Sequence, residues 1–192
     1  MDNSKVWFIA DTHFNHTNII KYCDRPFADR EKMNHCLINN WNNVVSKNDR
    51  VFILGDFALC GKDKIIEIGK QLNGRKTLIL GNHDGGGLQT YYNAGFEMVS
   101  KYPIIFNEYI LSHYPIDCSS TQFKNIYGHV HNSEQYRDIT LNDICVSVER
   151  ISYTPISLEE VEKKFKEVWL KIIESYLTNG TLELPRHKQE KF

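Results

Sequence analysis

Short apolar runs alternate with longer amphipathic stretches in the first half of the chain, and short runs dominate the segment from about 103 to 148. Runs of this length that are rich in β-branched and aromatic residues indicate buried strands. We therefore expect strands at Val6–Ala10, Val51–Leu54, Thr77–Leu80, Tyr109–Leu111, Asn125–Tyr127 and Ile144–Val148. This order of elements predicts a mixed α/β layered fold.

Apolar residues recur at intervals of three and four in the amphipathic stretches, which predicts helices. One helix is expected from about Asp29 to Val45, with Asp29 as its N-cap. Two more are expected at Lys64–Leu72 and Leu88–Asn93.

The clearest helix signal lies near the C-terminal end. The segment from Ser157 to Glu160 has the form of a capping box, and an apolar stripe follows it as far as Asn179 and Gly180. We expect this helix to pack on the domain, and the alternative is that part of its stripe contacts a partner or forms a homodimer. The chain is thus divided into a domain at 1–156, a C-terminal amphipathic helix at 157–178 and a flexible tail at 179–192.

Composition and charge exclude several classes of protein. The 23 Lys and Arg residues nearly cancel the 24 Asp and Glu residues, so the chain lacks the positive field that grips duplex nucleic acid. No apolar run approaches the roughly 20 residues that span a bilayer, and the first residues do not form a secretory leader. The five cysteines show no C-x-x-C spacing, which indicates free thiols. We expect a cytoplasmic protein that does not contact membranes.

Side chains able to bind metal ions follow five of the predicted strands. They are Asp11, His13, Asp56, Asn82, His83, Asp84, His113, His129 and His131. Because the carboxyl ends of parallel strands share one edge of a sheet, we expect these groups to converge. Each one alone is also explained by turn chemistry, but several imidazoles are costly to crowd unless something binds them. Nitrogen and oxygen donors of this kind suit manganese, iron, nickel or zinc.

The motifs carry a family resemblance. D-x-H, G-D, G-N-H-D, a lone His and G-H-x-H, in that order, resemble the calcineurin-like metallophosphoesterase superfamily from about residue 5 to 156. The string from Asp11 to Phe27 is similar to small bacterial and phage members. The resemblance implies a four-layer αββα arrangement, in which a β-sandwich is flanked by helices and holds two metal ions at its edge. The intervals between the later motifs are too short for a capping domain. The C-terminal helix is an addition to the αββα arrangement.

The resemblance also implies a division of the metal ligands. Asp11, His13 and His131 would hold one divalent ion, and Asn82, His113 and His129 would hold the other. Asp56 would bridge the two, which a carboxylate can do because it has two oxygens with free lone pairs. Manganese is the favoured ion, with iron, nickel or zinc as alternatives. Two such ions can share a water, lower its pKa toward neutrality and clamp phosphoryl oxygens.

The remaining motif residues receive roles near the substrate. The resemblance implies that His83 is not a ligand and protonates the departing oxygen, with Asp84 as the carboxylate that orients its ring. The alternative is that His83 only caps the glycine loop at 85–87. His16 and Arg25 are candidate contacts for a substrate phosphate, and a structural role is the alternative for each.

The resulting prediction is a metal-dependent phosphohydrolase with an open active site. We favour a phosphodiesterase that acts on a small nucleotide or a related phosphodiester, because the near-neutral charge speaks against nucleic acid. The alternatives are a phosphomonoesterase and a single-strand nuclease. A nuclease groove would draw on Lys21, Tyr22, Arg25, Tyr91 and Tyr92. A non-catalytic scaffold on the same fold is a further alternative, which the intact set of donors disfavours.

Overall fold

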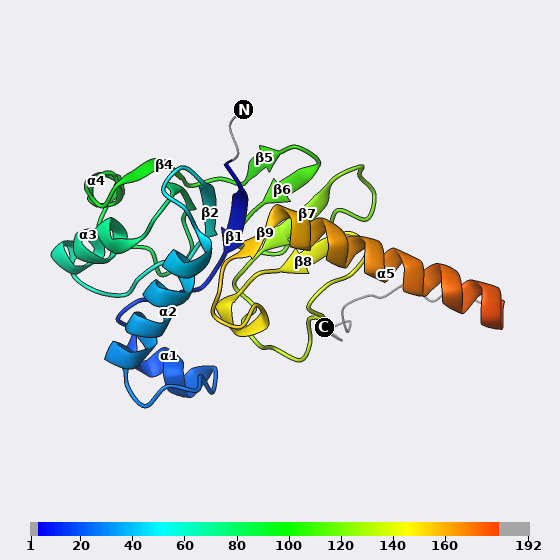
Figure 1. Cartoon of the computed structure of the whole chain (residues 1–192), viewed down its shortest axis with the longest axis horizontal. Helices are drawn as coiled ribbons and strands as arrows, with labels where there is room; N and C mark the ends of the chain where they lie inside the picture. The colour runs from blue at the N-terminus through cyan, green and yellow to red at the C-terminus, as the bar shows by residue number, and fades with distance from the viewer. Residues whose placement is uncertain (1–3, 181–192) are drawn as a thin grey trace.

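Two β-sheets packed against each other form the centre of the computed structural model, which describes residues 4–180 (Figure 1). The first sheet has the strand order β4-β3-β2-β1-β9. Its strands are β1 (Val6–Ile9), β2 (Arg50–Leu54), β3 (Arg75–Ile79), β4 (Phe96–Ser100) and β9 (Ile156–Ser157). The first four are parallel, and β9 pairs with β1 in the antiparallel direction.

The second sheet has the strand order β5-β6-β7-β8. Its strands are β5 (Ile104–Phe106), β6 (Tyr109–Leu111), β7 (Lys124–Tyr127) and β8 (Asp143–Cys145). The last three are parallel, whereas β5 forms an antiparallel hairpin with β6. Each sheet therefore contains a parallel part whose carboxyl ends share an edge.

Helices cover the face of the first sheet that points away from the second. They are α1 (Thr17–Tyr22), α2 (Arg30–Val44), α3 (Lys62–Gln71) and α4 (Leu88–Asn93). Successive side chains of a strand point to opposite faces, and β1 shows this clearly. Trp7 and Ile9 belong to the apolar cluster that includes Leu37 of α2, whereas Phe8 belongs to the core shared with Ile126 of the second sheet.

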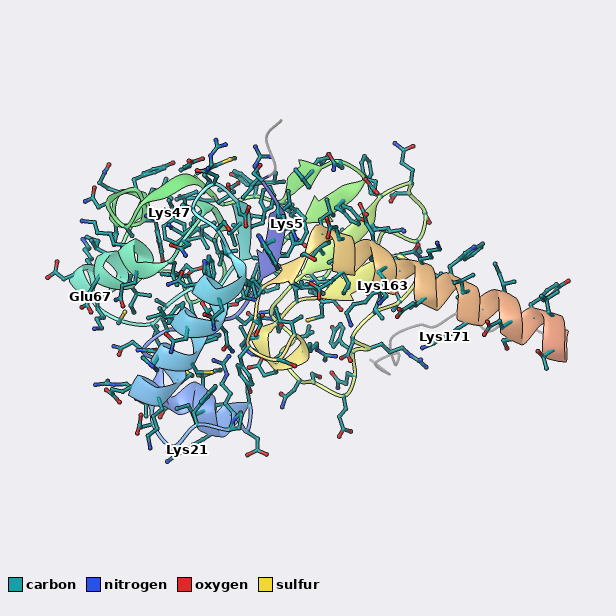
Figure 2. The ribbon with its side chains drawn as sticks, in the orientation of Figure 1. Lys5, Lys21, Lys47, Glu67, Lys163 and Lys171 are labelled. Atoms are coloured by element: carbon teal, nitrogen blue, oxygen red, sulfur yellow. The ribbon has the colours of Figure 1, made fainter. Side chains whose placement is uncertain are left out.

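The C-terminal helix α5 (Leu158–Asn179) begins with the predicted capping box, in which Ser157 and Glu160 exchange hydrogen bonds. Its first turns bury Phe165 in the core between the sheets, where the ring stacks 6.2 Å from that of Tyr109. The last turns extend beyond the sheets (Figures 1 and 2), and Trp169 in the middle of the helix is 53% exposed. The apolar stripe is therefore only partly covered within the described residues.

The predicted mixed α/β fold, with two sheets flanked by helices and an extra C-terminal helix, is confirmed. The predicted strand at Ile144–Val148 ends earlier, at Cys145, because the 3₁₀ turn η1 (Val148–Arg150) follows. Helix α1 and strands β4, β5 and β9 were not individually predicted. None of the described helices combines the length and apolar character needed to cross a bilayer. The predicted tail lies, from residue 181 onward, outside the described residues, and the division into domains stays a prediction.

Candidate metal centre

Five loops, each of which follows a strand, meet at one edge of the two sheets. They follow β1, β2 and β3 in the first sheet and β6 and β7 in the second. Two contacts join the sheets directly. The backbone N–H of His129 donates to Asp11 Oδ2 over 2.8 Å, and His113 Nδ1 lies 2.9 Å from the carbonyl oxygen of Leu54. The structure thus brings together side chains that are more than a hundred residues apart in the sequence.

The first group of donors comes from the loops after β1 and β7. Asp11, His13 and His131 each offer a ligand atom, and these atoms lie within 4.8 Å of one another. The rings of His13 and His131 are stacked, with their centroids 5.2 Å apart. The same spacing of ligand atoms holds for Asp11, Asp56 and His113, so the two groups adjoin.

The second group lies around His113. Its Nε2 atom is 3.0 Å from Asn82 Oδ1 and 3.3 Å from His129 Nδ1. Asp56 stands between the groups, because its Oδ2 atom is 3.4 Å from His13 Nε2 and 3.6 Å from His113 Nε2. Among these donors, a carboxylate is the one whose two oxygens allow it to serve both groups.

Two atoms of the first group test whether a cation fits. Asp11 Oδ1 and His13 Nε2 are buried and have no hydrogen-bond partner within residues 4–180. Burial raises the pKa of Asp11 to about 6 and lowers that of His13 to about 2, so this imidazole is neutral at physiological pH. Buried polar atoms without partners are costly, and a divalent ion would satisfy both. The residues present therefore fit a metal ion.

The backbone of the ligand loops is unusual. Five of the candidate ligands have φ angles between 47° and 70°, in the left-handed region that residues other than glycine rarely adopt. They are Asp11, His13, Asp56, His129 and His131. Such conformations cost about 1–3 kcal/mol each and cluster at functional sites. Their concentration at one edge indicates that the fold accepts a loss of stability in order to orient these side chains toward the centre.

Glycines let the ligand loops approach one another. Gly55 has a φ angle of +89°, and a Cβ atom there would lie 2.2 Å from His113 Nδ1. A Cβ atom on Gly128 would lie 2.5 Å from Ala10 Cβ and 2.7 Å from Asp11 Oδ2. Glycine is therefore required sterically in the G-D and G-H-x-H motifs, because a side chain at either position would push the two sheets apart.

Comparison with known proteins places this centre in a family. The model of the calcineurin-like phosphoesterase family matches residues 4–180. The chain belongs to this family. The family is dinuclear and metal-dependent, so the protein is a metal-dependent phosphoesterase.

Relatives of this phosphoesterase occur in archaea, bacteria and phages. An uncharacterised protein of Methanocaldococcus jannaschii is 41% identical over 174 residues, which cover 85% of this chain and 92% of that protein. The gene 66 protein of Mycobacterium phage L5 is 41% identical over 86 residues, which cover 43% of this chain and 41% of the phage protein. The crystal structure of a protein of unknown function from Aquifex aeolicus superposes with a TM-score of 0.67 and 29% identity, and covers 84% of this chain and 99% of that chain.

His83 and His16 of the phosphoesterase lie beside the first group of donors. The exposed His83 ring is 5.3 Å from that of His13 and 6.3 Å from that of His16, between centroids. The His83 backbone N–H donates to Asp56 Oδ1 over 2.8 Å, which fixes the start of its loop. His16 Nδ1 is 3.4 Å from His13 Nδ1. The predicted proton donor His83 and the predicted substrate contact His16 therefore lie beside the centre, and their roles remain proposals.

The prediction that Asp84 orients His83 is wrong. The Asp84 carboxylate accepts hydrogen bonds of 2.8 Å from the backbone N–H groups of Gly81, Asp56 and Phe57. Burial raises the pKa of this carboxyl, and the three N–H groups oppose the rise. Asp84 therefore ties the loop after β3 to the loop after β2, because its carboxylate satisfies backbone donors of both.

Arg25 does not reach the substrate face either. Its buried guanidinium donates to the carbonyl oxygens of Asp11 and Thr12 over 2.8 and 3.0 Å. It also forms an ion pair of 2.7 Å with the carboxylate of Glu149. The predicted phosphate contact is thus wrong and its structural alternative holds, because all the donors of the fork are engaged inside the protein.

Three residues near the centre were missed by the sequence analysis. Ser147 donates to Asp11 Oδ2 over 2.6 Å, and Glu149 accepts from His131 Nδ1 over 3.0 Å. Glu149 directly follows the predicted strand Ile144–Val148, so the rule of polar residues after a strand would have found it, whereas Ser147 lies inside that predicted strand. Tyr114, whose hydroxyl donates to Asn82 Oδ1 over 3.3 Å, has a weaker signal, namely its place directly after His113.

Proposed function

We propose that this phosphoesterase is a phosphodiesterase that hydrolyses a small nucleotide or a related phosphodiester. The observation that supports the proposal is the convergence of seven donor residues, in which Asp11 Oδ1 and His13 Nε2 are buried and have no hydrogen-bond partner among the described residues. The donors would divide as the family resemblance implies. Asp11, His13 and His131 would hold one ion, Asn82, His113 and His129 the other, and Asp56 both.

Manganese is the ion that we propose, since the set combines carboxylate, amide and imidazole and contains no thiolate. A pair of such ions supplies Lewis acidity and an activated water for phosphoester hydrolysis. The ion-binding side chains have to be deprotonated for this. His13 is already neutral at physiological pH, whereas the raised pKa of His131 means that its proton leaves when an ion binds.

His83 is the residue that we assign to the proton transfer. Its ring is exposed beside the donors, while its backbone is anchored on Asp56, so the imidazole can meet a substrate without moving the loop. It would donate a proton to the departing ester oxygen, and His16 lies close enough to contact a phosphoryl oxygen from the rim.

Two exposed aromatic side chains favour a substrate with flat rings. Tyr22 is 73% exposed and its ring lies 6.4 Å from that of His16. Tyr114 is 51% exposed and its ring lies 4.4 Å from that of His129. Aromatic side chains of this kind stack on nucleobases, and one on each side of the donors suits the two arms of a phosphodiester.

A test of the chemistry is hydrolysis of aryl phosphodiesters with Mn²⁺ by the wild type, His83→Ala and the control His35→Ala. His35 is an exposed histidine on α2, bonded to Asn39 and remote from the donors. We expect His83→Ala to lower kcat by about 10²–10⁴ while both ions stay bound. The loss should shrink as the leaving group becomes more acidic. Equal losses for acidic and basic leaving groups would contradict the proton-donor role.

The nuclease alternative loses part of its predicted groove. Arg25 and Tyr91 are buried, so of the five residues proposed for it only Lys21, Tyr22 and Tyr92 are exposed. Substrate binding that weakens steeply with salt would restore this alternative. We also propose a cytosolic location, which the absence of disulfides among the five described cysteines supports.

A further inference from the structure

A buried ion pair lies behind the first group of metal donors. We propose that Glu149, held by Arg25, is a positioning residue that sets the tautomer and orientation of His131 and thereby the affinity for the first of the two ions. This inference rests on the proposed function, because it concerns the ion assigned to Asp11, His13 and His131.

The contacts of Glu149 are specific and buried. Its Oε1 atom is 3.0 Å from His131 Nδ1, and the same oxygen accepts from Arg25 Nε over 2.9 Å and Nη2 over 2.7 Å. The side chains of Arg25 and Glu149 are 0% and 5% exposed. With the Nδ1 proton donated to the carboxylate, the free lone pair of the ring is on Nε2. Ligand histidines in proteins are oriented in this way.

Arg25 also holds the loop that carries the other two donors of the first ion, Asp11 and His13. Its Nη1 and Nη2 atoms donate to the carbonyl oxygens of Thr12 and Asp11, so one guanidinium joins the loop after β1 to Glu149. Within residues 4–180, no hydrogen bond of Arg25 or Glu149 reaches Asn82, His113 or His129. The pair therefore braces the donors of one ion and leaves those of the other alone.

Charge explains why both members are needed. A buried carboxylate without a cation is strongly disfavoured, and Arg25 supplies the charge that lets Glu149 stay ionised beside His131. A salt bridge with a purely structural role would support the donors of both ions alike. The positioning role instead predicts an effect on one ion alone, and this difference can be measured.

The experiment is a Mn²⁺ titration of the metal-free full-length protein, in which the wild type is compared with Glu149→Gln. Glutamine keeps the size of the side chain but removes the charge that orients the ring. We expect the affinity for one Mn²⁺ to fall by about 10–100-fold, as is typical for the partner of a ligand histidine, and the affinity for the other to stay unchanged. The control is Glu97→Gln, which makes the same chemical change in the exposed ion pair with Arg75 and should bind both ions as the wild type does.

The outcomes separate the inference from the proposed function. A wild type that binds no Mn²⁺ overturns both. A wild type with two ions and an unchanged Glu149→Gln isotherm overturns the positioning role alone. An equal loss of both ions together with a lower melting temperature also overturns it, in favour of general support of the loops.

A second measurement is made on the wild type, and a variant serves only to assign one signal. ¹⁵N spectra of histidine side chains in the Zn²⁺-loaded protein, assigned with His131→Asn, report which ring nitrogen binds the ion. We expect His131 to keep its proton on Nδ1 and to bind through Nε2. Binding through Nδ1 would overturn the role of Glu149, because that atom could not then donate to the carboxylate.

Discussion

Replacing Asp84 by asparagine tests whether its carboxylate clamps the loop after β3 to the loop after β2 or acts as a partner of His83. In the structure, Oδ2 of Asp84 accepts from the backbone N–H groups of Asp56 and Gly81, and Oδ1 accepts from that of Phe57. Asparagine has nearly the same shape but only one acceptor oxygen. Its amide nitrogen would have to face one of these three donors.

The cost follows from the hydrogen bonds. If the remaining oxygen keeps the Asp56 and Gly81 donors, the buried N–H of Phe57 is left unpaired, which costs about 1–3 kcal/mol. The other two bonds lose the contribution of the negative charge, about 1 kcal/mol each. We therefore expect a loss of roughly 3–5 kcal/mol, a large share of the 5–15 kcal/mol that is typical of a domain.

Urea unfolding of the metal-free protein measures this loss directly, with Asp63→Asn on the exposed start of α3 as the control. A clamp predicts a lower unfolding midpoint before any ion is added. If the midpoint of Asp84→Asn equals that of the wild type, the clamp is refuted.

Two further predictions concern pH. Burial opposes protonation of His131, but its hydrogen bonds with Cys23 and Glu149 and the charge of Asp11 prevail and raise its pKa to about 10. Ion binding at pH 8 should therefore release about one proton, and the affinity should rise with pH. Calorimetry in buffers of different ionisation enthalpy measures this release. An affinity that does not change with pH would contradict the prediction. Burial raises the pKa of Asp49, but donors from Ser46, Lys5 and Trp7 outweigh it and leave the pKa lowered. Its stabilising effect is present above about pH 4 and lost as the pH falls through the lower folded value, so Asp49→Asn should flatten the acid loss of stability in urea titrations. An unchanged acid profile would show that another carboxyl dominates.

The sequence predicted the parts of the fold that have strong periodic or capping signals. The strand at Val51–Leu54 and the capping box at Ser157 are single-segment features, so tertiary contacts were not needed to find them. Strand β9 has two residues and takes its strand character from pairing with β1, so no window of sequence could reveal it.

The candidate site was predictable where a motif carries the donor and unpredictable where a partner is chosen by packing. The donors from Asp11 to His131 follow strands, and the strand rule located them. The partners of Asp84 and Arg25 were misjudged, because a carboxylate and a guanidinium can serve a substrate or a backbone equally well. The burial of Arg25 and the backbone donors around Asp84 decide which.

Because α5 is only partly covered, the tryptophans of the protein differ in their exposure to solvent. Trp7 and Trp41 are buried in the body, whereas Trp169 on the middle turns of α5 is 53% exposed. Iodide should quench the emission of Trp169 and spare the other two indoles. A second molecule seated on those turns would shield this one fluorophore and shift its emission to the blue, so association of the helix can be followed without any label.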